Sequence, residues 1–175
     1  AFANVPIILS SGGRTLDSVG PDPALVIATP GAEPAAAGGY RAVVVLDMAA
    51  ALAQPGLRSQ EQAARRWFNA GALAHPGAPL VLVADPTWPV VQALIRWDPG
   101  WFAERELQQR RAAGMPPARK AVSIVGERPD LDEARTLMPD AATVLGPVPE
   151  GEREQLLVTV PHRAAADLLR RLRAL

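Results

Sequence analysis

The sequence predicts two modules in one chain of 175 residues. Residues 1 to about 95 are expected to form an incomplete doubly wound parallel α/β domain, because short apolar runs without polar alternation flank a helical pattern. Residues 96–175 are expected to form a small α+β domain, because the order changes there to helix, strand, short helix, two strands and helix. Hydrophobic residues make up 49% of the chain, which is enough for a packed core.

Four apolar runs in the first module have the composition of buried parallel strands. They are Val5–Leu9, Ala24–Ala28, Ala42–Leu46 and Leu80–Ala84. Between the third and fourth runs, Ser59–Ala74 carries small and aromatic residues on one face at helical spacing, and Ser59 and Gln62 have the spacing of a capping box. A helix at this place supplies the crossover that a parallel strand pair requires.

The segment Trp97–Lys120 is predicted to connect the modules through a helix. Pro99 and Gly100 end the preceding element, and Gly114 with the following prolines ends the new helix abruptly. From Arg96 to Lys120 there are six basic and three acidic side chains, which give this stretch a net charge of +3, whereas the whole chain has a net charge of zero. The connector therefore concentrates positive charge.

The second module is predicted to contain three strands and a terminal helix. The strands are Ala121–Val125, Thr143–Leu145 and Gln155–Val160. In Arg163–Leu175 the leucines share one face at helical spacing and the arginines lie on the other. The leucine face should pack on the module, and the arginine face should meet solvent or a partner.

Composition excludes several kinds of chemistry. The chain has no Cys and two isolated His residues, so thiolate zinc sites, disulfides and thiol nucleophiles are excluded. It has no signal-peptide pattern and no apolar run near the roughly 20 residues that span a bilayer. We therefore expect a soluble, cytoplasmic protein without a membrane partner, and the first residue, Ala1, suggests a piece of a longer protein.

Catalytic motifs are weak. Ser10–Gly13 follows the first strand but lacks the Lys-Ser/Thr of a phosphate-binding loop, so a tight turn is favoured. Asp47 and Asp85 follow predicted parallel strands, where open α/β sheets place ligands. Neither has a Lys, a His or a second carboxylate nearby, so capping is favoured over catalysis.

Arginine clusters are the remaining candidates, because phosphate contacts need positive charge and donors within reach. Glu106 precedes Arg110 by four residues, which is also the spacing of an ordinary helix-surface ion pair. The pI of the chain is near 7, whereas an autonomous DNA-binding domain is typically strongly basic. Composition alone therefore favours a solvated face over a DNA-binding face.

Two runs carry a family resemblance. Phe102–Leu107, Arg110-Arg111 and Gly114–Pro117 form the first, and Leu145–Pro149 with the later Gln155–Val158 form the second. Together they resemble the C-terminal part of the primosomal protein N′ family of replication-restart proteins. Upstream, Val44–Asp47 and Leu57-Arg58 with Glu61 resemble the family's second helicase lobe.

The resemblance implies a RecA-like helicase lobe 2, in part, over residues 1–95 and a DNA-binding domain over 96–175. It implies structure-selective, sequence-independent binding of forked or single-stranded DNA and primosome scaffolding when stalled forks restart. The other implied partners are single-stranded-DNA-binding protein and the replicative helicase or its loader, and any zinc would belong to an upstream module. The expected phosphate contacts are Arg110, Arg111, Arg119, Lys120, Arg163, Arg170 and Arg171.

This chain departs from the family at its ATPase motifs. With Arg58 and Glu61 aligned, the family's motif Gln falls on Asn69, and its two arginines fall on Leu73 and Pro76. Neither Leu73 nor Pro76 can stabilise the charge of a transition state as an arginine finger does. The pattern resembles a divergent branch with decayed helicase motifs, so no catalytic residue is expected. An ATP-driven helicase lobe and a protein scaffold without DNA contact remain as alternatives.

Overall fold

The structure, a computed structural model, describes residues 5–173 of the chain. It divides into two compact units, Ala1–Ala103 and Glu104–Leu175. The division falls inside helix α4 (Pro99–Ala112), several residues after the predicted boundary at residue 95. The connector helix thus begins in one unit and ends in the other, and each unit is described by itself.

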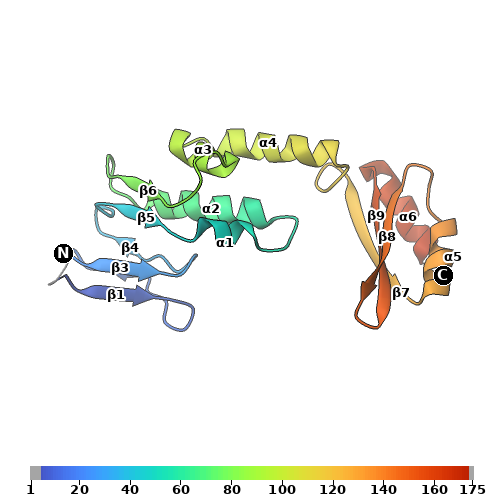
Figure 1. Cartoon of the computed structure of the whole chain (residues 1–175), viewed down its shortest axis with the longest axis horizontal. Coiled ribbons are helices and arrows are strands. Elements are labelled where there is room, and N and C mark those ends of the chain that lie inside the picture. Colours follow the sequence, from blue (N-terminus) through green and yellow to red (C-terminus); the bar gives the residue numbers. More distant parts are fainter. Residues whose placement is uncertain (1–4, 174–175) are drawn as a thin grey trace. The chain divides into compact units, whose positions relative to one another are not determined.

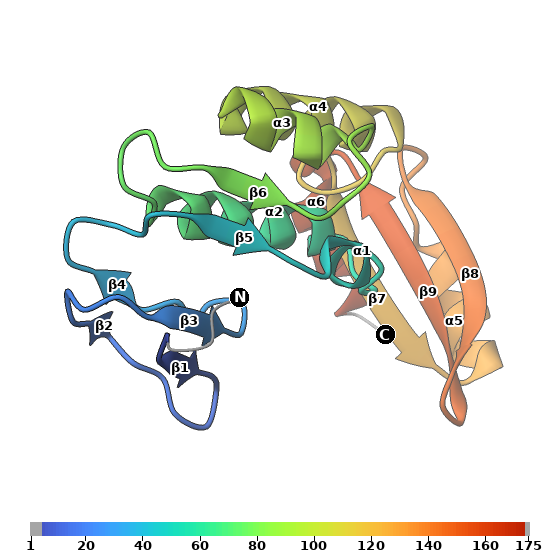
Figure 2. The same ribbon diagram turned by 60° about the vertical axis from the view of Figure 1, so that its left-hand side comes forward.

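The first unit contains short parallel strand pairs. Strand β1 (Ile7–Ser10) pairs with β3 (Leu25–Ala28), and β5 (Val43–Val45) pairs with β6 (Leu80–Leu82). A further pair of two-residue strands joins β2 (Ser18–Val19) to β4 (Ala35–Ala36). Figures 1 and 2 show β1, β3, β5 and β6 running in the same direction. The four apolar runs therefore form parallel strands, as the sequence predicts.

Three helices accompany these strands: α1 (Met48–Leu52), α2 (Ser59–Ala72) and α3 (Pro89–Arg96). Helix α2 is the predicted crossover between β5 and β6. Its predicted capping box is wrong, because Arg58 is the N-cap residue and no side chain caps the helix. The Ser59 hydroxyl instead donates a hydrogen bond to the Gly56 carbonyl at 2.9 Å.

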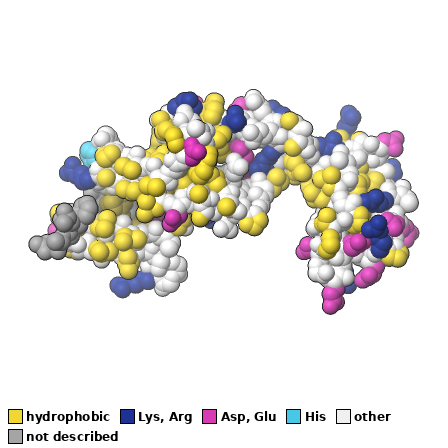
Figure 3. All heavy atoms as spheres, viewed as in Figure 1, with side chains coloured by type: hydrophobic (Ala, Val, Ile, Leu, Met, Phe, Trp, Pro, Cys, Tyr) yellow, Lys and Arg dark blue, Asp and Glu magenta, His cyan; other side chains and the backbone are white. Residues whose placement is uncertain are grey.

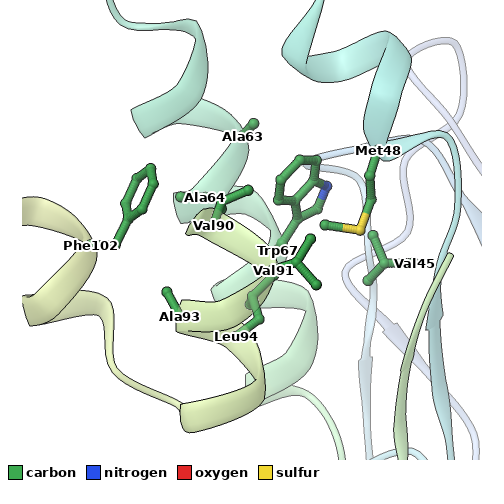
Figure 4. Packing of buried hydrophobic residues seen from close by; sticks show 10 residues of the cluster. All are labelled: Val45, Met48, Ala63, Ala64, Trp67, Val90, Val91, Ala93, Leu94 and Phe102. Atoms are coloured by element: carbon green, nitrogen blue, oxygen red, sulfur yellow. The ribbon is translucent and has the colours of Figure 1, made fainter. Parts of the chain in front are cut away.

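The core of the first unit lies between one face of β5 and β6 and the helices. Trp67 of α2 is the largest buried residue there, and Met48, Val90 and Val91 lie around its indole ring in Figure 4. Small residues at Ala63 and Ala64 let neighbouring elements approach α2. Burial of Trp67 confirms the predicted packing face. Phe102, from the first turns of α4, belongs to the same core.

The opposite face of the strands is bare, and here the prediction of fully buried strands is wrong. Successive residues of each strand alternate between buried or half-buried and exposed positions. Large aliphatic side chains on the bare face are 41–63% exposed: Ile7, Leu9, Leu25, Ile27, Val44, Leu46, Val81 and Val83. The apolar runs predict two buried faces, whereas residues 5–173 cover only one of them.

The second unit is a three-stranded antiparallel sheet with helices on one face. Strand order is β7-β9-β8, with β7 at Lys120–Gly126, β8 at Thr143–Glu150 and β9 at Arg153–Val160. Helix α5 (Arg128–Thr136) follows β7. After β9 a short 3-10 helix, η1 (His162–Ala164), leads into α6 (Ala165–Leu172). Strands β8 and β9 are longer than predicted.

The core of the second unit forms between the sheet and the two helices. Leu156, Val158 and Val160 of β9 are fully buried, and Leu131 of α5 and Leu168 of α6 pack on them. The central strand is thus anchored along most of its length. Leu168 of α6 packs as predicted, but the prediction is wrong for Leu169, which is placed on the same face by the sequence pattern and is 45% exposed in the structure. The predicted continuation to Leu175 lies outside the described residues.

Candidate nucleic-acid interface

One end of the second unit's sheet is assembled from two segments that are distant in sequence. Strand β7 starts there and β9 ends there, since Lys120 is paired with Val160. The ring nitrogen Nε2 of His162 lies 2.7 Å from the Pro117 carbonyl oxygen, which ties η1 to the turn before β7. We call this region, residues 111–120 with 160–163, the connector end.

Exposed cations gather at the connector end. Arg111 in the last turn of α4, Lys120 at the start of β7 and Arg163 in η1 are all exposed. Arg111 lies 4.0 Å from Glu104, but both side chains are more than half exposed, and such pairs contribute little. These three predicted residues are therefore accessible to a phosphate.

Arg110 departs from the prediction of a phosphate contact. It is only 7% exposed, its Nη1 donates to the Pro116 carbonyl at 3.1 Å, and its Nη2 lies 3.8 Å from the Glu106 carboxylate. The amide N–H of Met115 also bonds to the Arg110 carbonyl at 2.8 Å. The buried Arg110 side chain thus holds together the turn that follows α4. The i,i+4 pair expected from the sequence exists, but it is buried.

Arg119 is also engaged in the structure. Its Nη2 donates to the backbone carbonyls of Ala141 and Thr159, the second at 2.9 Å. Its Nε is buried, and no hydrogen-bond partner for it is found among the described residues. Arg119 therefore fastens the start of β7 to the end of β9 and to the loop before β8. Its guanidinium therefore orders the connector end.

Arg170 and Arg171 lie in the last turn of α6. Both pair with Asp167, Arg170 at 3.3 Å and Arg171 at 2.9 Å. Seven or eight residues of helix separate them from Arg163, which corresponds to roughly 11 Å. Arg163 thus joins the connector end, whereas the other two occupy a separate position on α6. Both remain exposed.

The other end of the same sheet is acidic. It carries Glu150, Glu152 and Glu154 around the β8–β9 turn, with Glu127 and Asp130 at the start of α5. In Figure 3 acidic side chains gather where Figure 1 places this turn. Arg128 is neutralised there by Glu154 at 3.3 Å and Asp132 at 3.6 Å. The charge of the unit is therefore polarised along its strands.

The polar residues singled out in the first unit have structural roles. Ser10 is buried, donates to the Ala32 carbonyl at 2.6 Å and accepts from the Leu16 amide, which gives the predicted tight turn. Asp85 accepts hydrogen bonds from the amide and hydroxyl of Thr87, and these bonds lower the pKa of its carboxyl. The predicted capping role holds for Asp85. Asp47 has a left-handed backbone at the start of α1, and its side chain does not cap that helix.

Residues 69–76 contain the positions where the family motif would lie. Asn69 is exposed on α2, Leu73 is the C-cap residue of that helix, and Pro76 is exposed in the following loop. Within residues 5–173, no group of three or more His, Asp or Glu side chains is arranged to hold a metal ion. The described helices include none that is both long and apolar enough to cross a bilayer.

The sequence analysis missed the part played by His162, which it counted only as one of two isolated histidines. The imidazole joins segments 45 residues apart, and only the pairing of β7 with β9 brings them together. Its position directly after Pro161 was the available signal, since a proline with φ −55° directs the chain away from the strand.

The chain is similar in sequence to known proteins over both units. Residues 111–175, which include the three strands, match the family model described as the primosomal protein N C-terminal domain. This defines the class of the second unit. Over 99% of the chain, the sequence is 40% identical to the probable replication restart protein PriA of Mycobacterium leprae, and over 87% it is 42% identical to that of Mycobacterium tuberculosis.

The chain belongs to this PriA family and corresponds to its C-terminal part. It spans 29% of the length of the M. leprae relative and 25% of that of the M. tuberculosis relative.

Proposed function

We propose that the second unit binds DNA through the phosphate backbone and anchors a replication-restart protein at stalled or branched forks. The observation that carries this proposal is the group of exposed cations at the connector end, Arg111, Lys120 and Arg163, opposite an acidic end. A phosphate backbone would be attracted to one end of the unit and repelled from the other.

The composition of the second unit supports recognition of backbone over bases. Residues 104–175 contain no Phe, Tyr or Trp. Proteins that hold single strands without sequence preference commonly stack bases on aromatic rings. Without such rings, the unit is left with phosphate contacts, which are independent of sequence and suit the duplex arms of a fork.

We further propose that this chain contributes no ATPase chemistry. Neither Leu73 nor Pro76 carries a charge that could reach a γ-phosphate, and Asn69 stands where the family motif has Gln. If ATP turnover by the full-length protein falls when residues 69–76 are substituted, this part of the proposal is wrong. Loss of turnover would then favour the alternative of a helicase lobe.

The decisive experiment compares two double variants that remove the same charge. Lys120→Ala/Arg163→Ala removes two of the three exposed cations of the connector end, and Arg128→Ala/Arg153→Ala removes two exposed arginines near the acidic end. Binding to a labelled fork is measured by fluorescence anisotropy over a range of salt concentrations. The first variant should bind more weakly and flatten the plot of log K against log salt by roughly two.

The matched control should leave that slope unchanged. Equal effects of the two variants would show that only net charge matters, and no effect of either would remove the connector end as the DNA site. In the latter case, a scaffold without DNA contact becomes the better account. Titration with an acidic peptide that reproduces the tail of single-stranded-DNA-binding protein then tests the scaffold, together with assays of the replicative helicase or its loader as partners.

A further inference from the structure

The connector end contains one side chain whose charge can change near neutral pH, the imidazole of His162. Residues 111–120 and 160–163 carry no acidic side chain. Their permanent cations are Arg111, Arg119, Lys120 and Arg163. Histidine is the side chain whose ordinary charge change falls between about pH 5 and pH 8. The other histidine of the chain, His75, belongs to the first unit.

The hydrogen bond to the turn before β7 fixes which ring nitrogen of His162 carries hydrogen. Nε2 lies 2.7 Å from the Pro117 carbonyl oxygen, and a carbonyl only accepts, so Nε2 must be the donor. In the neutral ring Nδ1 is then an unprotonated acceptor. The side chain is exposed, and Nδ1 has no hydrogen-bond partner among residues 5–173. Protonation of Nδ1 therefore adds a positive charge and leaves the bond to Pro117 intact.

Positive charge adjoins the ring on the neighbouring segments. Lys120 starts β7 three residues after Pro117, and Arg163 follows His162 directly in η1. The acidic side chains of α4 and α6 nearest in the chain are paired with arginines: Glu104, Glu106 and Asp167. Asp140 lies in the loop before β8, next to the Ala141 carbonyl that accepts from Arg119. A phosphate bound by Lys120 and Arg163 would add a negative charge beside Nδ1, and an opposite charge within about 4–6 Å favours the protonated ring.

We propose that the protonated ring of His162 is a fourth phosphate contact of the connector end, so that DNA binding takes up one proton from solution. The inference rests on the proposed DNA site and adds a dependence on pH to it. The phosphodiester remains ionised throughout, and the only covalent change is the new N–H bond at Nδ1. Because the bound state holds one more proton, the association constant rises as pH falls.

The test measures fork binding by fluorescence anisotropy with the parent chain and two variants. His162→Gln keeps an N–H donor for the Pro117 carbonyl but cannot titrate, and His75→Gln is the matched control in the first unit. For the parent chain, the association constant should rise roughly fivefold or more from about pH 8 to about pH 6, and the salt slope should steepen by roughly one. His75→Gln should keep both changes, and His162→Gln should lose both. A pH dependence retained in His162→Gln, or absent from the parent chain, overturns the proposal.

A second measurement needs no substitution and therefore does not depend on a variant that folds. The chain has two histidines, so the ring protons of both can be followed by NMR during a pH titration, with and without the fork. With the fork bound, the titration midpoint of His162 should move to higher pH by about half a pH unit or more, because the phosphate favours the charged ring. The midpoint of His75 should stay where it is. An unmoved midpoint for His162 overturns the proposal.

Failure of the role of His162 is distinguishable from failure of the DNA site. If Lys120→Ala/Arg163→Ala leaves fork binding unchanged, the connector end is not the DNA site and both proposals are wrong. If that double variant weakens binding while His162→Gln retains the affinity and pH dependence of the parent chain, the DNA site stands and only the role of His162 is wrong.

Discussion

Replacement of Arg110 by Ala distinguishes a structural arginine from a phosphate contact. The guanidinium is buried, donates to the Pro116 carbonyl at 3.1 Å and lies 3.8 Å from Glu106, which is itself buried. Removal of the Arg110 guanidinium leaves the Glu106 carboxylate buried and without this cation beside it. Breaking one partner of a buried pair costs about 3 kcal/mol at the lower end of the observed range, and the long separation of this pair favours that end.

The assay is thermal and urea unfolding of Arg110→Ala beside Arg111→Ala. In a domain of this size about 3 kcal/mol lowers the melting temperature by about 10 °C or more. Arg111→Ala should have almost no effect on stability, because its pair with Glu104 is exposed. In DNA binding the order should reverse, with the salt slope reduced by roughly one for Arg111→Ala and unchanged for folded Arg110→Ala.

A compensating double variant distinguishes the stability lost with the packing of Arg110 from the stability lost because the Glu106 carboxylate has no partner. Arg110→Met/Glu106→Leu removes both charges at similar volume and should recover most of the lost stability, because hydrophobic replacements of buried pairs are often neutral or better. The reasoning is refuted if Arg110→Ala melts with the parent protein and weakens DNA binding with a flatter salt slope. Arg110 would then act as the phosphate contact that the sequence predicts.

Three further outcomes can be measured by unfolding. Leu168→Ala should lower the free energy of unfolding by about 2–5 kcal/mol, because the side chain is fully buried. Leu169→Ala, at a half-exposed position of the same helix, should lower it by well under about 1 kcal/mol. Similar values for the two variants would contradict the packing of α6. The pKa of the Asp85 carboxyl is lowered in the folded protein, so the carboxylate stabilises the fold at pH values above its ordinary pKa. This contribution disappears as pH falls through the folded-state pKa, so Asp85→Asn should reduce the loss of stability in acid. An unchanged dependence of stability on pH would show that Asp85 does not contribute in this way. Gly71→Ala should destabilise by about 1–3 kcal/mol and alter tryptophan fluorescence, because the new Cβ would lie 2.9 Å from the Trp97 ring; an unchanged melting temperature would show that the indole moves freely.

The strands and helices follow closely from local pattern. The four parallel strands, the crossover helix α2 and the antiparallel β7–β9 pair lie where apolar runs and helical spacing predict them. Short elements were missed, including α1 and α3, since five and eight residues give little periodicity to detect. The predicted capping box fails because the turn at Gly56 takes the Ser59 hydroxyl.

The candidate site is less evident from sequence, because accessibility of a cation depends on distant segments. Arg110 and Arg111 are adjacent and chemically identical, yet one closes a turn from inside and the other is exposed. Arg119 and Lys120 differ in the same way, since Thr159 lies 40 residues from Arg119 in sequence. No local pattern distinguishes such pairs.

By itself, the sequence determined the two modules, the identity of most strands, the positive connector and membership of a replication-restart family. These properties depend on short-range periodicity, composition and motif spacing. Only the tertiary structure decided which arginines remain accessible, that Lys120 and Arg163 share one end of a sheet, and that one apolar face is bare. The physical reason is that burial and charge pairing depend on which strands pair, and strand pairing is a long-range property of the chain.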